Sequence, residues 1–302
     1  MSQTQDEAVI ATNNDATNCK RFAVHVGYWQ DKYIQFFAKL GERKAPEINR
    51  GYYARTKGIS YLLEQFLEMT ESNCQVISLG AGFDTLFWQL KEKDIAPKVF
   101  VEIDLNAVVD RKCFCIKSRK QLQEVFKPED NLQIGKREVH STCYHLLAAD
   151  LRDVSMIDLQ LNSIALDRSL PTIFIAECVL VYMEPEKSSA LLDWAGKNFT
   201  TAVFLNYEQV NMKDGRNCNL LGALVCPDLQ SQRNRFLASS WQAANALTME
   251  DVYRYLPRTE IERIEKLEFL DEVDLLFQLL SHYCLSWGYN DSLKIGLSSI
   301  GF

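Results

Sequence analysis

The sequence predicts an α/β protein with a doubly wound, mostly parallel sheet, and three features indicate this fold. Apolar runs typical of strands alternate with stretches compatible with helices between residues 76 and 206. The first run enters a glycine turn that contains Gly80 and Gly82. Polar side chains end successive runs, namely Asp104, Asp150, Glu177 and Asn206. Because parallel strands bring their carboxyl ends to one edge, these side chains predict a ligand site there.

The individual elements are expected as follows. Strands are predicted at residues 75–79, 99–103, 144–149, 172–176 and 202–205, with another possible near 261–267. Helices are predicted at residues 86–90, 108–116, 250–256 and 273–280, and after Pro185, which suits the first turn of a helix. Before the first strand, apolar residues at helical spacing over 18–40 and 59–67 predict two helices interrupted at Pro46. We therefore expect a disordered N-terminus at 1–17, a helical lid at 18–70, and a main domain at 71–302 that carries a substrate-facing insertion around 208–256.

Composition excludes several classes of function. The 302 residues carry a net charge of -7, whereas broad nucleic-acid binding needs a basic face. The nine cysteines contain no Cys-x-x-Cys pair and the four histidines are dispersed, so we expect no metal site and a reduced, cytosolic protein. No apolar run approaches the roughly 20 residues of a membrane span. The polar, acidic first residues do not resemble a signal or transit peptide.

The glycine turn indicates which cofactor the edge would bind. A dinucleotide fingerprint requires a third glycine where this chain has Thr85. Asp84 at the helix start would repel a pyrophosphate, but it could hold an ammonium group. S-adenosylmethionine, which has a cationic amino-acid end and no phosphate, fits better. A nicotinamide-dependent oxidoreductase stays open, because Asp104 lies 22 residues after Gly82, as an acid does in that class.

Longer motifs extend these observations over nearly the whole chain. The most specific are Ile175-Ala176-Glu177-Cys178-Val179-Leu180-Val181-Tyr182-Met183 and Asn206-Tyr207-Glu208-Gln209-Val210-Asn211. Others lie at 19–24, 27–29, 43–52, 79–82 with 84–85, 149–153, 267–272 and 282–284. Together they resemble the leucine carboxyl methyltransferases. The resemblance implies a class I S-adenosylmethionine-dependent methyltransferase with a Rossmann-like sheet, a helical N-terminal lid and C-terminal additions.

The resemblance also implies roles for individual residues. The residues implied to bind S-adenosylmethionine are Lys20, Arg55, Gly80, Gly82, Asp104, Asp150, Leu151 and Glu177. Asp104 would accept hydrogen bonds from the ribose, while Asp150 and the Leu151 N–H would contact the adenine. Arg55 and Lys20 would bind the methionine carboxylate, and Glu177 would accept from its ammonium group. Before the resemblance is considered, Lys20 and Arg55 are more simply explained as solvated helix charges.

The implied acceptor is the C-terminal leucine α-carboxylate of the protein phosphatase 2A catalytic subunit, which would become a methyl ester. Tyr182, Asn206 and Tyr207 are the residues expected to position it, although Tyr182 could equally be a core residue. A peptide α-carboxyl group has a pKa of roughly 3.3–3.7 and is already ionised at neutral pH. We therefore expect no catalytic base, and S-adenosylhomocysteine as the second product.

Alternatives remain open at the level of sequence. A related methyltransferase could act on a modified tRNA base or a small carboxylate, and a non-catalytic protein could simply hold phosphatase subunits. The family pattern is also interrupted, because a segment present in family members after Asp214 is shortened near Gly215. That departure affects the side expected to face the acceptor and should spare cofactor binding. We expect a monomer.

Overall fold

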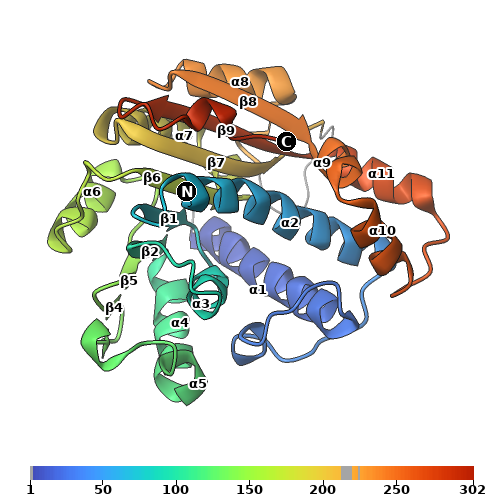
Figure 1. Cartoon of the computed structure of the whole chain (residues 1–302), viewed down its shortest axis with the longest axis horizontal. Coiled ribbons are helices and arrows are strands. Elements are labelled where there is room, and N and C mark those ends of the chain that lie inside the picture. The colour runs from blue at the N-terminus through green and yellow to red at the C-terminus, as the bar shows by residue number, and fades with distance from the viewer. Residues whose placement is uncertain (1–2, 212–219, 224) are drawn as a thin grey trace.

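A central β-sheet organises the chain (Figure 1). The computed structural model describes residues 3–211, 220–223 and 225–302. The strand order is β3-β4-β5-β2-β1-β6-β7-β9-β8, and the five strands from β5 to β7 in this order are parallel. The strands are β1 Gln75–Leu79, β2 Val99–Asp104, β3 Gln133–Ile134, β4 Val139–His140, β5 Tyr144–Ala148, β6 Thr172–Glu177, β7 Thr201–Gln209, β8 Ala243–Thr248 and β9 Tyr283–Asp291. The chain winds outward on both sides of β1, so the predicted doubly wound, mostly parallel sheet is confirmed.

Helices cover both faces of this sheet and bury a separate hydrophobic cluster on each (Figure 1). One cluster contains residues of α1 to α4, α9 and α11, and the other contains residues of α6, α7 and α8. The helices are α1 Gln3–Val26, α2 Pro46–Met69, α3 Leu86–Glu92, α4 Asn106–Ser118, α5 Lys120–Gln123, α6 Val154–Ser163, α7 Pro185–Asn198, α8 Leu229–Leu237, α9 Met249–Tyr255, α10 Arg258–Glu265 and α11 Val273–Ser281. Because α2 shares its cluster with α3 and α9, a boundary at residue 70 does not divide two cores.

The N-terminal region differs from its prediction. Residues 3–17 were expected to be disordered, but they belong to α1, which runs to Val26. The helix expected over 18–40 is wrong beyond Val26, because that stretch continues through a loop and a short 3-10 turn at Ile34–Phe36. Pro46 does not interrupt a helix but begins α2, where its missing N–H costs no hydrogen bond. Apolar spacing alone did not distinguish loop residues packed on the core from a helix.

The C-terminal additions also differ from the prediction. The stretch near 261–267 is helix α10 and not a strand. The final apolar run forms β9, which pairs antiparallel with both β7 and β8. Strand β7 continues to Gln209, four residues past the predicted end, with consequences for the site described below. The shortened segment near Gly215 lies outside the described residues.

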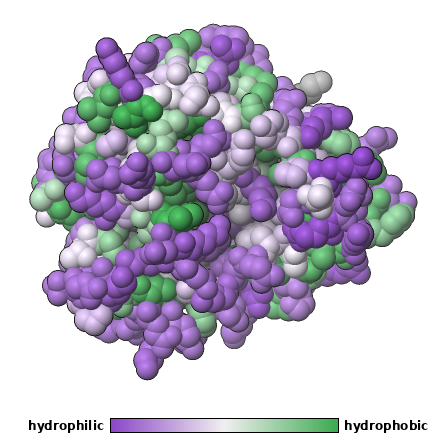
Figure 2. Space-filling view, in the orientation of Figure 1, coloured by the Kyte–Doolittle hydropathy of each residue, from purple (hydrophilic) through white to green (hydrophobic). Residues whose placement is uncertain are grey.

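The molecular surface in the orientation of Figure 2 is largely hydrophilic, with apolar residues scattered among charged ones. Among the described helices, none combines the length and apolar character needed to cross a membrane. Single exposed apolar side chains of this kind are ordinary on folded proteins.

Candidate active site

A cavity of about 760 Å³ opens at the carboxyl ends of the parallel strands. That size lies within the range of about 300–1,000 Å³ typical of small-molecule pockets. Its walls come from the β1–α3 turn, the ends of β2, β5, β6 and β7, and the helices α1, α2 and α11. The predicted site residues that line it are Lys20, Arg55, Gly80, Gly82, Asp104, Asp150, Leu151, Glu177, Tyr182 and Tyr207.

The glycine turn adopts a backbone conformation that other residues rarely take. Gly80 and Gly82 have φ values of +64° and +53°. A Cβ atom on Gly80 would lie 2.6 Å from a methyl group of Val179, and one on Gly82 would lie 2.4 Å from Oδ1 of Asn13. Asn13 Oδ1 also accepts a hydrogen bond of 3.0 Å from the Phe83 N–H. The space that a Cβ atom would need at these two glycines is therefore filled by the side chains of Val179 and Asn13, and Asn13 belongs to α1.

Asp104 ends β2 directly beside this turn. Its two carboxylate oxygens accept hydrogen bonds from the backbone N–H groups of Gly82 and Leu105, each at 2.7 Å. Burial raises the pKa of Asp104, and the two N–H donors partly offset that effect. Each oxygen keeps a lone pair for a further donor, so the carboxylate can accept from the two hydroxyls of a ribose.

The end of β5 provides a second set of polar groups. Asp150 pairs with Arg152, whose Nη2 lies 2.5 Å from Oδ2, and Arg152 also pairs with Asp6 of α1 at 2.8 Å. Burial opposes ionisation of Asp150, but the Arg152 hydrogen bonds outweigh it and lower the pKa of that carboxyl. Within the described residues, the Leu151 N–H donates no hydrogen bond. That free donor beside a carboxylate suits the edge of an adenine ring.

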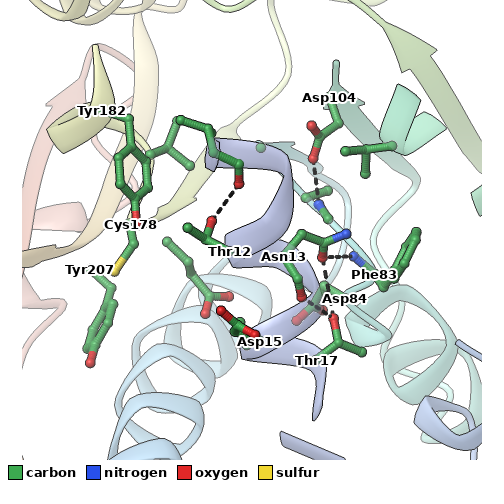
Figure 3. A pocket seen from close by; sticks show the side chains of 18 of the residues that line it. Thr12, Asn13, Asp15, Thr17, Phe83, Asp84, Asp104, Cys178, Tyr182 and Tyr207 are labelled. Atoms are coloured by element: carbon green, nitrogen blue, oxygen red, sulfur yellow. Dashed lines mark hydrogen bonds between the residues drawn. The ribbon is translucent and has the colours of Figure 1, made fainter. Parts of the chain in front are cut away.

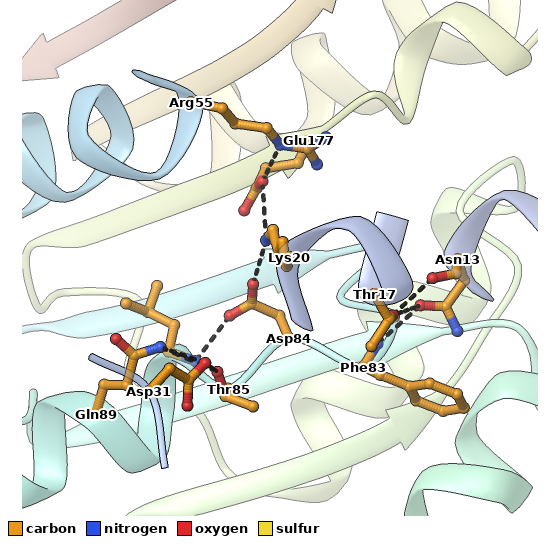
Figure 4. A network of polar contacts seen from close by, with 12 residues as sticks. Asn13, Thr17, Lys20, Asp31, Arg55, Phe83, Asp84, Thr85, Gln89 and Glu177 are labelled. Carbon is orange, nitrogen blue, oxygen red and sulfur yellow. Dashed lines mark hydrogen bonds and ion pairs between the residues drawn. The ribbon is translucent and has the colours of Figure 1, made fainter. Parts of the chain in front are cut away.

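A chain of four charged side chains crosses the centre of the site (Figure 4). Arg55 Nε lies 2.5 Å from Oε2 of Glu177, and Lys20 Nζ lies 3.4 Å from that oxygen. Lys20 Nζ also lies 2.7 Å from Oδ2 of Asp84. Burial would lower the pKa of Lys20, but Asp84 and Glu177 reverse that effect and raise it. The two cations and two anions balance each other, so the chain can exchange internal partners for the carboxylate and ammonium group of one amino acid.

Aromatic side chains gather at the end of the cavity that lies away from Asp104 and Phe83. Figure 3 shows Tyr182, Cys178 and Tyr207 together on one side, separated from Asp104 and Phe83 by residues of α1. The Arg55 guanidinium lies 4.6 Å from the centre of the Tyr207 ring. Tyr207 thus borders the charged chain, and Tyr182 lies on the same side of the cavity, where an acceptor could approach.

Asn206 does not line the cavity, contrary to the prediction. It is fully buried within β7, and its Nδ2 lies 3.4 Å from Oγ of Ser286 on the neighbouring strand β9. Successive side chains of a strand point to opposite faces, so Tyr207 and Gln209 share the cavity face, whereas Asn206 and Glu208 do not. Because β7 was predicted to end at Leu205, Asn206 was misplaced at the rim.

Sequence reasoning missed other residues that line the cavity. Asn13 was hidden by the polar composition of a segment expected to be disordered. Tyr52 lies one helical turn before Arg55 on α2, so helical spacing could have identified it. Gln209 could have been found by extending the two-residue period of β7 beyond Tyr207. Among the described residues, no group of three or more His, Cys, Asp and Glu side chains could hold a metal ion.

A doubly wound sheet, a glycine turn after β1 and an acid ending β2 define a site for a ribose-bearing cofactor, as S-adenosylmethionine-dependent methyltransferases have. A solved structure described as a methyltransferase from Thermobifida fusca has the same fold, with a TM-score of 0.53 at 12% identity, covering 91% of this chain and 94% of that one. Residues 8–196 match the family model of leucine carboxyl methyltransferases. Leucine carboxyl methyltransferase 1 of Bos taurus is 48% identical over 100% of this chain and 95% of its own length.

The Rattus norvegicus protein of the same name is 46% identical over 98% of this chain and 94% of its own length. By contrast, the human tRNA wybutosine-synthesizing protein 4 is 33% identical over 91% of this chain, which spans only 43% of that protein. The chain belongs to the leucine carboxyl methyltransferase family. It is a methyltransferase, and the oxidoreductase alternative is excluded.

Proposed function

We propose that this protein transfers a methyl group from S-adenosylmethionine to the C-terminal leucine α-carboxylate of the protein phosphatase 2A catalytic subunit. Family membership supports the leucine carboxyl group as the acceptor. The observation that carries the cofactor part of the proposal is the balanced chain of Arg55, Glu177, Lys20 and Asp84, which matches the charges of a methionine end. A tRNA acceptor has less support, because the tRNA wybutosine-synthesizing relative is 33% identical to this chain, whereas leucine carboxyl methyltransferase 1 of Bos taurus is 48% identical.

The cofactor would lie along the strand ends. Arg55 and Lys20 would bind the methionine carboxylate, and Glu177 and Asp84 would accept from the ammonium group. Asp104 would bind the ribose hydroxyls, while the Leu151 N–H and Asp150 would contact the adenine. The bound cofactor supplies an electrophilic methyl group on a sulfonium.

The acceptor needs no activation by a base. A peptide α-carboxyl group has a pKa of roughly 3.3–3.7, so it arrives ionised. None of the four histidines lines the cavity in the part of the chain that the structure describes. The protein would act by aligning the carboxylate oxygen with the methyl group and by excluding water from both. Such alignment can contribute about 7–11 kcal/mol, which makes a general base unnecessary.

Helix α1 would act as the lid of this site. Its residues contact both ends of the strand edge, Asn13 at the glycine turn and Asp6 at Arg152. Cofactor exchange would then require the N-terminal part of α1 to move, while Ala23 near its other end stays in the core cluster that it shares with α2.

We propose that the protein acts in the cytosol as a monomer.

The direct test is transfer of a labelled methyl group from S-adenosylmethionine to intact phosphatase catalytic subunit. A matched subunit that lacks its last leucine serves as the control. We expect label only on the intact subunit and its release by mild base, as for an ester. Label on both proteins, or label that resists base, would contradict carboxyl-terminal esterification.

A further inference from the structure

Hydrogen bonding fixes the Arg55 guanidinium through only one of its three nitrogen atoms. Nε pairs with Glu177, as described above. Nη1 and Nη2 make no hydrogen bond with the described residues, yet neither belongs to the polar atoms that are buried without a partner. Both nitrogens therefore keep accessible surface, and Arg55 lines the cavity. A guanidinium placed in this way offers a planar fork of N–H donors to a carboxylate in the cavity.

Two aromatic rings contact the same guanidinium. Its central carbon lies 4.6 Å from the centre of the Tyr207 ring and 5.7 Å from the centre of the Tyr52 ring. Both distances lie within the roughly 6 Å over which the face of a ring attracts a cation. A guanidinium that stacks on a ring keeps the N–H groups in its plane available to an anion. The rings can therefore orient the cation without occupying the donors that a ligand needs.

The two rings belong to different parts of the fold. Tyr207 lies on β7, and its ring is stacked on that of Tyr283 of β9, with centres 5.3 Å apart and an angle of 10° between the planes. Tyr52 lies on α2, three residues before Arg55, so the two side chains are neighbours on one face of that helix. The sheet and the helix thus each place a ring against the guanidinium.

Tyr52 has no role in the function proposed so far. Resting on the cofactor part of that proposal, we infer that Tyr52 is a positioning residue that acts through Arg55: its ring orients the guanidinium toward the cofactor carboxylate. Tyr207 contributes a second ring, but it is also expected to position the acceptor, so Tyr52 allows the cleaner test. The role requires the ring of Tyr52 and not its hydroxyl group.

The test compares two ligands in calorimetric titrations, S-adenosylmethionine and its decarboxylated analogue, which lacks only the carboxylate. We expect Tyr52→Leu to weaken the affinity for S-adenosylmethionine about fivefold. The affinity for the analogue should stay within about twofold, because Arg55 has no carboxylate to bind there. Tyr52→Phe keeps the ring and should retain the wild-type affinity for both ligands. A general distortion of the site would instead weaken both ligands in Tyr52→Leu.

Phe277 provides a matched control within the same chain. Its ring lies 4.7 Å from the central carbon of the Arg254 guanidinium, and it does not line the cavity. Phe277→Leu therefore removes a similar contact between a ring and an arginine away from the ligands. We expect it to leave the affinity for S-adenosylmethionine unchanged.

A double substitution tests whether Tyr52 acts through Arg55. Once Arg55→Ala has removed the guanidinium, adding Tyr52→Leu should cause no further loss of affinity for S-adenosylmethionine. A further fivefold loss there, an unchanged affinity in Tyr52→Leu alone, or equal losses for the two ligands would overturn the inference. So would a loss in Tyr52→Phe as large as that in Tyr52→Leu, because the hydroxyl group would then be the part that binds. Failure of the wild type to bind S-adenosylmethionine would instead overturn the proposed function, and this inference with it.

Discussion

Two clusters of opposite charges lie next to each other in this molecule and have different surroundings. In one, Lys112 Nζ lies 2.6 Å from Oε2 of Glu102, and both side chains are at most 1% exposed. Tyr144 donates to the same Glu102 oxygen at 2.7 Å. In the other cluster, Lys20 and Arg55 pair with Asp84 and Glu177 along the cavity wall, where the side chains are 10–20% exposed.

The two clusters meet at Asp84. Lys112 donates to its backbone carbonyl at 2.9 Å, while its carboxylate pairs with Lys20. The buried cluster does not border the cavity, so no ligand can replace its partners. The cavity cluster borders the ligand space and can exchange partners there. Similar ion pairs therefore have different roles: the buried cluster holds the turn in place, and the cavity cluster is the one proposed to bind the cofactor.

The largest expected effect comes from breaking the buried cluster. Lys112→Met leaves the Glu102 carboxylate buried without its cation, which typically costs about 3–5 kcal/mol in the free energy of unfolding. Urea denaturation followed by circular dichroism measures this loss. Lys120→Met is the control, because Lys120 and Glu124 form an exposed pair whose removal should cost less than about 0.5 kcal/mol. Similar losses in both variants would remove the distinction between the clusters.

Breaking the cavity cluster should affect binding more than stability. Arg55→Ala leaves Glu177 paired with Lys20, so the chain still folds, but it removes a cation proposed to bind the cofactor carboxylate. We expect affinity for S-adenosylmethionine to fall about 100-fold, or about 2.7 kcal/mol. Asp104→Ala should show a comparable loss through the ribose. Calorimetry measures both, and unchanged affinity in Arg55→Ala would contradict the role given to this cluster.

The sequence predicted these two regions unequally, for physical reasons. Asp104 and Glu177 end parallel strands, and an apolar run followed by an acid is a local pattern. Glu102 lies within such a run, and its partner Lys112 lies on the next helix, so only the packed structure identifies the pair. Most sheet strands were predicted, because five parallel strands buried on both faces are nearly all apolar.

The sequence predictions were wrong where the polarity of a helix or the length of a strand departed from the usual pattern. The polar residues of α1 face the cavity as well as solvent, so the part of the helix up to residue 17 was predicted as disordered. β7 is buried throughout but contains Asn206, Glu208 and Gln209, which led to a premature end of the strand. One misplaced strand end was enough to exchange Asn206 for Gln209 in the predicted site.

Glu208 differs from the carboxylates of both clusters. It is buried, but it has no ion-pair partner within 4.0 Å among the described residues. Its oxygens accept from the Val181 and Gln209 N–H groups, and burial raises its pKa to about 7 from an ordinary value of 4.5. The folded protein thus binds more protons than the unfolded chain between these values. The contribution of this group to stability is present below pH about 4.5 and is lost as the pH rises through about 7.

Glu208→Gln should remove this pH dependence. From pH 5 to pH 8 we expect the wild-type unfolding free energy to fall by about 2 kcal/mol more than that of the variant. Taking the difference between the two proteins cancels other groups, such as His145, whose pKa burial lowers to about 4 and whose contribution has the opposite sign. Urea denaturation at several pH values measures the difference. If the unfolding free energies of the two proteins changed with pH in parallel, Glu208 would be ionised at neutral pH, like the paired carboxylates.

The smallest expected effect concerns the histidines, which belong to neither cluster. His25 is exposed near the end of α1, and His282 follows α11, so neither lies in the cavity lining. Because the proposed acceptor is ionised before it binds, no proton has to be removed during methyl transfer. His25→Ala and His282→Ala should keep kcat within about twofold, whereas loss of a general base typically costs about 10²–10⁴-fold. A loss of that size with unchanged cofactor affinity would show that catalysis uses a proton-transfer group that the charged chain does not supply.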